Sequence, residues 1–412
     1  LNYHVDLDLH DKFGSHVSLD KSGKSMAVLA PGYDGLGNAS NNEGALYMVS
    51  MLPDGSTVSN FKLHSNSDWF TSLSRMNLKM AGFAINAEWD RLIVVGADYT
   101  LKGFSFGMSP GGEALHSPQG LLSMGNPYPI AARDRFGSSI ALSSDGSLMA
   151  IGASYTPSFS QQGWTPPGAV RLFSFDGEGY GAGTLVGTIG HGYYGSGNLH
   201  VSNLGADDGF GASVALNAKG DRLAVGAPGD DGAFNDIFNS GAVYLFGFSR
   251  PGFAGAAQHK MIGKSYSINP DTEAGDAFGA SVTLNAVGDR LAVGSPGDDG
   301  FGNGYSSSGA VHLYAFTDST YSALSASGKA GRAYSAVSVS MSHHLRRTTC
   351  SAVPFPLTAL ATDLQWEPLR MPVLAIFGPV LGPYIFSDSA TDHSLLQRDL
   401  VPWVRVISGL QF

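Results

Sequence analysis

The stretch FGASVALNAKGDRLAVGAPGDD at residues 210–231 decides the fold, because the chain repeats it almost unchanged at residues 278–299. The second copy, FGASVTLNAVGDRLAVGSPGDD, differs at only three positions. Weaker copies begin with Phe-Gly at Phe13 and Phe136, and another at residues 84–98 keeps only the turn and the second apolar stretch. A repeat spaced by about 55 to 75 residues predicts a unit of several strands rather than one solenoid coil.

Each copy has the pattern of short strands joined by tight turns. In the first copy, SVALN alternates Val214 and Leu216 with small or polar residues, which is the period of a strand. The turn AKGD then places Gly220 where a hairpin needs a positive φ. RLAVGA is apolar throughout, which is typical of a strand covered on both faces. The strand GAVYLFGF and a glycine-rich fourth strand complete a four-stranded antiparallel unit.

A sheet that is apolar on both faces needs a neighbour on each side. Leaving one face in water costs about 25 cal/mol per Å² of apolar surface. Identical sheets stacked around an axis cover one another instead. We therefore predict an all-β fold, a β-propeller of four-stranded antiparallel blades, with about five blades visible and a partial sixth as an alternative. A linear β-solenoid and an open array of similar units are the competing architectures.

Composition supports this prediction and bounds the domains. The chain has 55 glycines, 11% aromatic residues and only 14% charged residues, which suits many short strands. Residues 1–330 hold the repeats, whereas residues 331–412 contain four of the glycines and no lysine. The second segment is predicted to be an atypical tail that completes one blade or is poorly ordered.

Charge and hydropathy exclude two classes of partner. The formal net charge is −10 and no basic stripe occurs, so we expect no nucleic-acid partner. The uncharged apolar run at residues 371–387 is short for a bilayer helix and contains three prolines. No membrane span is therefore expected.

The order of these motifs resembles a known repeat. Phe210-Gly211, followed by Gly-Ala-Pro at residues 226–228, is similar to the FG-GAP repeat of integrin α-subunit propellers. It is more similar still to the long repeats of large bacterial surface or secreted proteins. The resemblance covers roughly residues 1–330. It implies an extracellular or cell-surface location, a role in adhesion or scaffolding, and often bound calcium.

Calcium-binding repeats of this family carry the metal in the first hairpin. The turns at residues 217–221 and 285–289 offer too few carboxylates for a cation that takes about six to eight oxygens. A different acidic loop recurs after the second strand, where carboxylate, amide and glycine can present oxygens to calcium. Asp-Gly and Asn are also ordinary turn formers whose side chains bond their own backbone.

These loops give the predicted binding residues. Trp164, in an insertion, is either an exposed recognition aromatic or a cap on a blade. The predicted ligand-binding residues are Asp34, Asn38, Asp230, Asp231, Asn235, Asp298, Asp299, Asn303 and Trp164. The predicted calcium ligands among them are Asp231, Asn235, Asp299 and Asn303.

Two motifs match catalytic signatures only formally. Gly-Phe-Ser-Phe-Gly at residues 103–107 falls on an expected strand, whereas a nucleophile elbow needs a strand-to-helix turn. The glycine-rich residues 190–195 precede no helix that could meet a pyrophosphate. We therefore expect no enzyme.

The predicted function is a non-enzymatic extracellular or cell-surface module for binding or adhesion, with a protein or a glycan as partner. The alternatives are an architectural spacer in a surface protein and a hydrolase on a propeller scaffold. Acidic loops that meet on one rim beside an exposed aromatic residue favour binding. Acidic loops that lie far apart in solvent favour the spacer.

Overall fold

The computed structural model describes much of the repeat region. The residues described are 11–19, 25–33, 44–51, 57–64, 82–87, 89–95, 101–108, 114–124, 135–155, 167–175 and 183–332. Within these ranges the strands form five sheets, and the only helical element is the single 3-10 turn η4, Phe301–Asn303. The predicted tail after residue 330 lies outside the described residues, apart from its first two.

Each sheet is a blade of consecutive antiparallel strands, and blade 3 adds a short parallel strand at its outer edge. Blade 1 contains β1 His16–Leu19, β2 Ser25–Ala30, β3 Ala45–Met51 and β4 Thr57–His64. Blade 2 contains β5 Gly82–Ile85, β6 Arg91–Val95, β7 Leu101–Met108 and β8 Ala114–Met124. Blade 3 contains β9 Phe136–Leu142, β10 Leu148–Ala153, β11 Ala169–Ser174, β12 Thr184–Gly190 and β13 Leu199–His200.

The two near-identical copies form the last two blades. Blade 4 contains β14 Ser213–Leu216, β15 Arg222–Ala227, β16 Ala242–Arg250 and β17 Ala254–Gly263. Blade 5 contains β18 Ser281–Leu284, β19 Arg290–Ser295, β20 Ala310–Phe316 and β21 Leu324–Gly331. The weak copy at residues 84–98 also builds a complete blade, because β6 and β5 still supply the apolar hairpin that the neighbours need.

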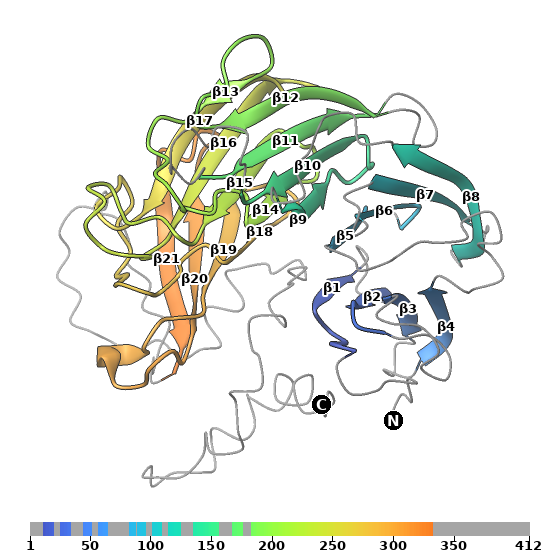
Figure 1. The fold of residues 1–412 in the computed structure, drawn as a ribbon, viewed down its shortest axis with the longest axis horizontal. Helices are drawn as coiled ribbons and strands as arrows, with labels where there is room; N and C mark the ends of the chain where they lie inside the picture. The colour runs from blue at the N-terminus through green and yellow to red at the C-terminus, as the bar shows by residue number, and fades with distance from the viewer. Residues whose placement is uncertain are drawn as a thin grey trace, which may run out of the picture.

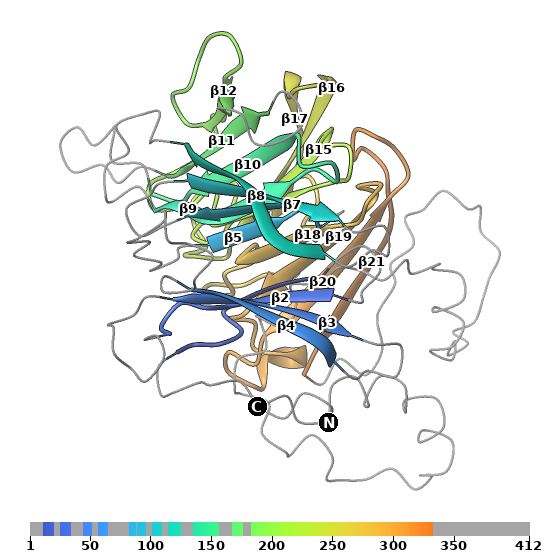
Figure 2. The ribbon, with the colours of Figure 1, turned by 90° about the vertical axis from the view of Figure 1, so that its right-hand side faces the viewer.

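The blades are arranged as a β-propeller. Figures 1 and 2 show them following one another in sequence order around an axis, with β1, β5, β9, β14 and β18 innermost. These first strands contact one another from blade 1 through blade 5. The predicted all-β propeller of four-stranded antiparallel blades is confirmed. The partial sixth blade has no counterpart among the described residues.

The hydrophobic core lies between blades rather than inside one sheet. Tyr244 and Phe246 of β16 pack with blade 3, whereas Val243 and Leu245 on the other face of the same strand pack with blade 5. Phe210 links the first of these interfaces, because its ring lies edge-on to Tyr244, 5.3 Å between centroids, and its N–H donates to the carbonyl of Pro167 before β11 of blade 3, at 2.6 Å. The alternation of each strand therefore separates two buried faces, not a buried face from a solvated one.

The Phe-Gly and Val-Gly motifs are two halves of one contact between blades. Gly279, with φ +91°, turns its carbonyl toward blade 4 and accepts a hydrogen bond of 2.7 Å from Ser213 Oγ. A Cβ on Gly226 would lie 1.9 Å from that carbonyl oxygen. Gly152 of blade 3 faces the carbonyl of Gly211 in blade 4 at the same 1.9 Å. Glycine therefore stands on both sides of the contact between blades 3 and 4 and of the contact between blades 4 and 5, whereas Gly137 of blade 3 meets the side chain of Val95 in blade 2.

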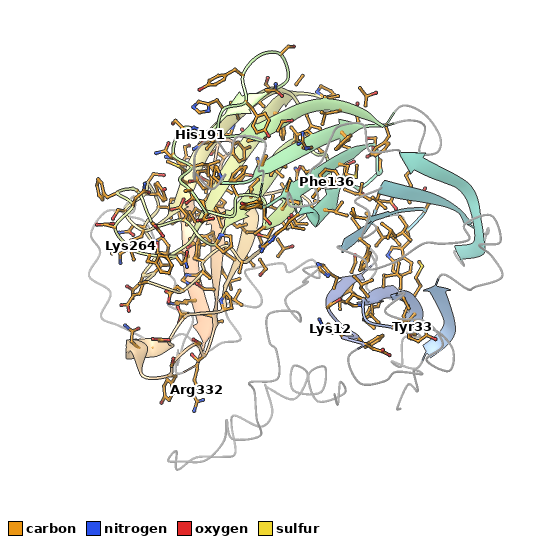
Figure 3. All side chains as sticks on the ribbon, viewed as in Figure 1. Lys12, Tyr33, Phe136, His191, Lys264 and Arg332 are labelled. Atoms are coloured by element: carbon orange, nitrogen blue, oxygen red, sulfur yellow. The ribbon has the colours of Figure 1, made fainter. Side chains whose placement is uncertain are left out.

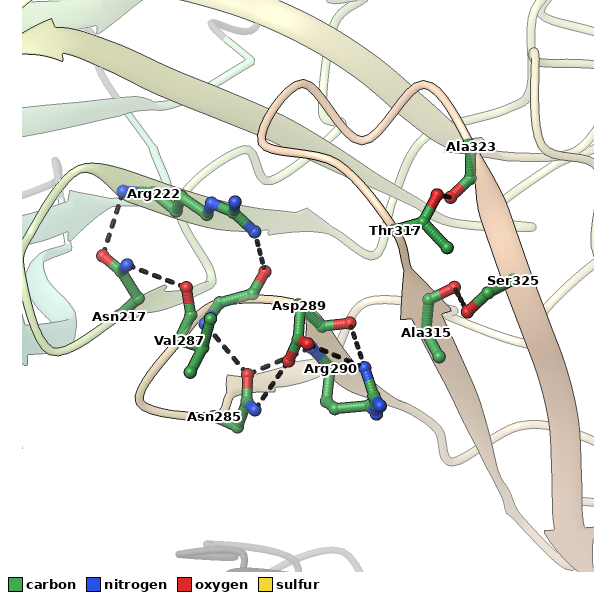
Figure 4. Close-up of polar contacts among 11 residues, drawn as sticks. Asn217, Arg222, Asn285, Val287, Asp289, Arg290, Ala315, Thr317, Ala323 and Ser325 are labelled. Atoms are coloured by element: carbon green, nitrogen blue, oxygen red, sulfur yellow. Dashed lines mark hydrogen bonds and ion pairs between the residues drawn. The ribbon is translucent and has the colours of Figure 1, made fainter. Parts of the chain in front are cut away.

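The hairpins after the first strands join the blades at one rim, here called the hairpin rim (Figure 4). Asn217 Nδ2 donates to Asp221 Oδ1 within its own turn, at 2.6 Å. It also donates to the carbonyl of Val287 in the next blade, at 3.2 Å, as Figure 4 shows. Arg222 Nη1 donates to the carbonyl of Gly288 at 2.9 Å. The polar side chains of these turns thus hold neighbouring blades together.

We predict that Gly226→Ala lowers the free energy of unfolding by about 3 kcal/mol, because the new Cβ would force blades 4 and 5 apart. Gly304→Ala is the matched control: its backbone has φ −88° and nothing lies within 4 Å of a built Cβ. Urea denaturation followed by circular dichroism measures both. Equal stabilities of the two variants would contradict this account of blade packing.

Candidate functional site

The predicted ligand-binding loops of blades 4 and 5 occupy the rim opposite the hairpin rim. Residues 228–241 connect β15 to β16, and residues 296–309 connect β19 to β20. Residues 271–277, which lead into β18, lie between these two loops. We call the three segments together the loop rim.

Hydrogen bonds make the loop rim one continuous surface. Gly275 N donates to the carbonyl of Phe238 in the blade 4 loop, at 2.9 Å. On the other side of the same segment, Asn303 Nδ2 of the blade 5 loop donates to Glu273 Oε2, at 2.7 Å. The acidic loops of blades 4 and 5 are therefore linked on one rim through residues 271–277, while the third acidic loop, at Asp34, lies outside the described residues.

Both loops are also fixed to the end of the fourth strand of their own blade. Ala233 N donates to the carbonyl of Lys264 at 3.0 Å, and Phe301 N donates to the carbonyl of Arg332 at 3.1 Å. Lys264 and Arg332 lie on the same side of the molecule in Figure 3. The guanidinium of Arg332 stacks over the ring of Tyr305, 4.3 Å from its centroid. Each loop is thus fixed near its start to the end of the fourth strand of its own blade.

Asp231 and Asp299, two of the predicted ligands, close these loops from within. Asp231 Oδ1 accepts the backbone N–H of Asn239 at 2.7 Å, and Asp299 Oδ1 accepts that of Ser307 at the same distance. Each bond spans eight residues, so each carboxylate ties the start of its loop to its end. One oxygen of each carboxylate is consequently committed to the backbone.

The other two predicted calcium ligands serve as turn residues. Asn235 and Asn303 have φ of 52° and 55°, the left-handed region that asparagine tolerates well. In the described part of the chain, no three His, Cys, Asp or Glu side chains gather as they would around a metal ion. The described geometry does not fit a calcium site, and calcium binding stays a prediction.

The carboxylate of Asp230 is buried inside blade 4, and both of its oxygens accept hydrogen bonds. Its carboxylate accepts the hydroxyl of Tyr244 at 2.7 Å, the hydroxyl of Tyr266 at 3.1 Å and the N–H of Gly232 at 2.8 Å. Burial raises the pKa of Asp230, and the hydroxyl of Tyr244 opposes that rise most strongly. Asp230 therefore stabilises the start of the loop from inside the blade and is not available to a ligand at the surface.

Asp298 holds the same position in blade 5 but has a different partner. Lys329 Nζ lies 2.6 Å from Asp298 Oδ2, and Gly300 N donates to the other oxygen at 2.9 Å. His312 replaces Tyr244, with Nε2 4.0 Å from the same Oδ2. Burial and the nearby Lys329 lower the pKa of His312 to about 3, so this imidazole is neutral and forms no ion pair. The buried carboxylate of blade 5 is therefore paired with a lysine ammonium, whereas that of blade 4 accepts hydrogen bonds from two tyrosine hydroxyls.

A second buried carboxylate lies close to Asp230. Asp208 Oδ2 accepts the N–H of Gly205 at 2.7 Å. Burial raises the pKa of Asp208 to about 7, and the negative charge of Asp230 adds to the rise. In blade 5 the corresponding Asp276 has its pKa raised to about 6, again chiefly by burial. Blade 4 therefore holds a carboxyl group that titrates near neutral pH.

Exposed aromatic side chains are the feature of the loop rim that sequence reasoning missed. Phe234 and Phe238 of the blade 4 loop are 76% and 69% exposed, and Phe301 and Tyr305 of the blade 5 loop are 66% and 40% exposed. The available signal was the presence of apolar residues inside loops otherwise rich in Gly, Asp, Asn and Ser. That composition has no packing reason to contain phenylalanine.

The remaining sequence predictions fall elsewhere. Asp34, Asn38 and Trp164 lie outside the described residues. Residues 103–107 lie within strand β7, not at a strand-to-helix turn. Residues 190–195 run from the end of β12 into a turn before β13. No helix in the described ranges is long and apolar enough to cross a bilayer.

The chain contains FG-GAP repeats. A family model described as "FG-GAP repeat" matches residues 197–246, from just before β13 of blade 3 into β16 of blade 4, and residues 268–314, from before β18 into β20 of blade 5. The repeat identity expected from the Phe-Gly and Gly-Ala-Pro motifs is thereby confirmed. No curated protein matches the chain.

Solved structures give only distant likenesses. A protein provisionally assigned as a 6-phosphogluconolactonase from Bacteroides uniformis has 12% identity and a TM-score of 0.41, covering 80% of this chain and 84% of its own. A similarly assigned protein from Bacteroides fragilis has 12% identity and a TM-score of 0.38, covering 73% and 66%. A periplasmic gluconolactonase of Pseudomonas aeruginosa has 15% identity and a TM-score of 0.39, covering 75% and 67%. Likenesses this weak carry no argument about activity.

We predict that Asp208 makes stability fall as pH rises. Its folded-state pKa is raised from 3.8 to about 7, so its contribution is complete below pH 3.8 and is lost as pH rises through about 7. Asp208→Asn keeps an oxygen acceptor for Gly205 N but cannot ionise. At pH 8 this variant is expected to be more stable than wild type by up to about 4 kcal/mol.

The measurement is urea denaturation at intervals between pH 4 and pH 8. Asp236→Asn, which removes one exposed carboxylate from the same blade, is the control and is expected to follow the wild-type curve. If Asp208→Asn keeps the wild-type slope, the buried carboxyl is not the titrating group.

Proposed function

We propose that this protein is a non-enzymatic binding or adhesion module of the extracellular space or cell surface, and that its loop rim contacts a protein or glycan partner. The observation that carries this proposal is the set of exposed aromatic rings on two loops that join into one surface. FG-GAP repeats are typical of extracellular proteins, which supports the location.

Exposed rings of this size are unfavourable unless a partner covers them. Each phenylalanine left in water forgoes about 2 kcal/mol of burial free energy. Aromatic residues are also enriched where protein interfaces concentrate their binding energy. Phe238 and Phe301 stand on loops held by backbone hydrogen bonds, so the surface they form needs little ordering when it binds.

The spacer alternative is less well supported. A spacer needs only the blade interfaces, and those depend on the strands and on the hairpin rim. It gives no reason for several aromatic rings on the loop rim. No observation among the described residues favours a hydrolase, since the elbow-like sequence at residues 103–107 lies inside β7.

The test is binding of the purified protein to arrays of immobilised glycans and extracellular-matrix proteins. We predict that wild type binds at least one of these ligands. The double variant Phe238→Ser/Phe301→Ser is expected to weaken that binding about tenfold or more, because both rings lose their contact area. Affinities are measured by surface plasmon resonance.

Val287→Ser provides the matched control, because Val287 is an apolar residue 63% exposed on the opposite, hairpin rim. It is expected to leave the affinity unchanged. An equal loss of affinity in the control, or a wild-type protein that binds none of the ligands, argues for the spacer instead.

A further inference from the structure

Blade 4 buries two carboxyl groups where two segments of the chain meet. Asp208 and Asp230 are 3% and 1% exposed. Gly229, the residue before Asp230, donates its N–H to the carbonyl of Asp208 at 2.9 Å, so the segment that enters blade 4 lies against the start of the blade 4 loop. Two carboxyl groups in such a place do not both ionise at low cost, because each is desolvated and each repels the other.

The groups around this pair do not supply a positive charge. The charged groups that act on Asp208 are Asp230, Asp231 and Asp207. Asp230 in turn faces Asp231 and the hydroxyls of Tyr244 and Tyr266. Burial raises the pKa of both tyrosines, so they stay neutral hydrogen-bond donors. Each of these groups is therefore acidic or neutral.

Blade 5 balances the equivalent pair with an ammonium group. Asp276 and Asp298 take the places of Asp208 and Asp230 in the second copy of the repeat. Lys329 Nζ lies 2.6 Å from Asp298 Oδ2. Burial raises the pKa of Asp276 to about 6, and the charge of Lys329 opposes that rise. One negative charge of the blade 5 pair is therefore compensated by a group that stays protonated.

The strand register shows why blade 4 has no such ammonium. Lys329 of β21 stands opposite His312 of β20, and the same two positions of blade 4 hold Met261 and Tyr244. A thioether carries no charge, and a phenol can only donate a hydrogen bond. The blade 4 pair must therefore keep a proton to avoid a second buried negative charge.

The blade 4 loop is closed through Asp230 and its neighbour. Gly241 N donates to the carbonyl of Asp230 at 2.8 Å, and Asn239 N donates to Asp231 Oδ1 at 2.7 Å. Both bonds join the end of the loop to its start, and the two exposed phenylalanine rings of the loop lie between these ends. A displacement of Asp230 therefore reaches the exposed part of the loop rim.

We propose that Asp208 and Asp230 form a pH-sensitive switch, which holds one proton in the closed state of the blade 4 loop and loosens that loop when the proton is lost. The second negative charge at the start of the loop is relieved when the loop moves outward into water. The blade 5 loop stays closed over the same pH range, because Lys329 supplies a fixed positive charge. This regulation goes beyond the binding role proposed above, since it acts on the loop with or without a ligand.

The switch favours the closed loop in mildly acidic solution. Burial raises the pKa of Asp208 from 3.8 to about 7, and the charge of Asp230 is the next cause. A carboxyl group whose folded-state pKa is raised holds its proton below that value and loses it above. The proton is therefore present below about pH 7 and absent above it.

The first experiment is an NMR titration of the full protein between pH 5 and pH 9, which follows the amide signals of Gly205 and Gly232. These N–H groups donate to Asp208 and Asp230. We expect both signals to shift with one midpoint near pH 7, because the two carboxyl groups titrate together. A midpoint below pH 5 for Gly205, or a Gly232 signal that does not shift with it, overturns the proposal.

The second experiment is hydrogen exchange of the N–H groups that close the loops, at pH 6 and pH 8, relative to unstructured amides. Asn239 and Gly241 are expected to lose protection about tenfold at pH 8, since a group titrated one unit past its pKa loses about that factor of proton-linked stability. Ser307 and Gly309, which make the equivalent bonds to Asp299 and Asp298 in blade 5, are expected to keep theirs. An equal loss in both blades reports global unfolding and overturns the local switch, as does unchanged protection in blade 4.

Two variants test whether the missing counter-charge is the cause. Asp208→Asn cannot ionise, so the protection of Asn239 is expected to be the same at both pH values. Tyr244→His/Met261→Lys gives blade 4 the ammonium of blade 5 and is expected to reduce the tenfold change to less than about twofold. If the double variant does not fold, Asp208→Asn decides alone. A wild-type pH dependence in Asp208→Asn overturns the proposal.

Ligand binding gives a separate measurement. For an array ligand that needs the loop rim, wild type is expected to bind about tenfold more weakly at pH 8 than at pH 6, and Asp208→Asn equally at both. If the blade 4 amides respond but no array ligand binds, the switch stands and the binding role fails. If an array ligand depends on Phe238 and Phe301 but the amides do not respond, the switch is wrong and the binding role stands.

Discussion

The packing of blades 3, 4 and 5 depends on the close approach of a glycine carbonyl in one blade to a glycine Cα in the blade before it. The carbonyl of Gly279 lies where a side chain on Gly226 would be, and Ser213 holds it there. One glycine is needed for its positive φ and the other for its missing Cβ. The glycines that the two near-identical copies share at these positions are therefore a packing requirement.

The buried position at the start of that loop shows how much freedom the repeat leaves. Asp230 is met by tyrosine hydroxyls and Asp298 by a lysine, while Tyr33 takes the same place in blade 1, with its ring 6.4 Å from that of Tyr47. Burying an unpaired carboxylate costs several kcal/mol, so blades 4 and 5, which place a carboxylate here, must supply it with donors. Both use the N–H of the glycine two residues later, whereas the side-chain donors differ between the two blades.

The sequence predicted the blades well because strands obey a local rule. The period of two in SVALN, the unbroken apolar run RLAVGA and the hairpin glycine Gly220, which has φ +68°, all appear as expected. The candidate site was less predictable. In the pair Asp230-Asp231, spacing could not tell which carboxylate turns inward, since that depends on Tyr266, 36 residues away along the chain. Nor could it show that Asp231 reaches the N–H of Asn239.

The exposed aromatic residues of the loop rim are not shared between the two copies, unlike the residues that build the blades. In the aligned copies, Phe301 stands where blade 4 has Ala233, and Phe234 stands where blade 5 has Gly302. The two copies treat the first of these positions differently, since Ala233 packs against the core of blades 3 and 4 whereas Phe301 is exposed. Residues shared between the copies preserve the propeller, whereas exposed residues that differ between copies are free to specify a partner.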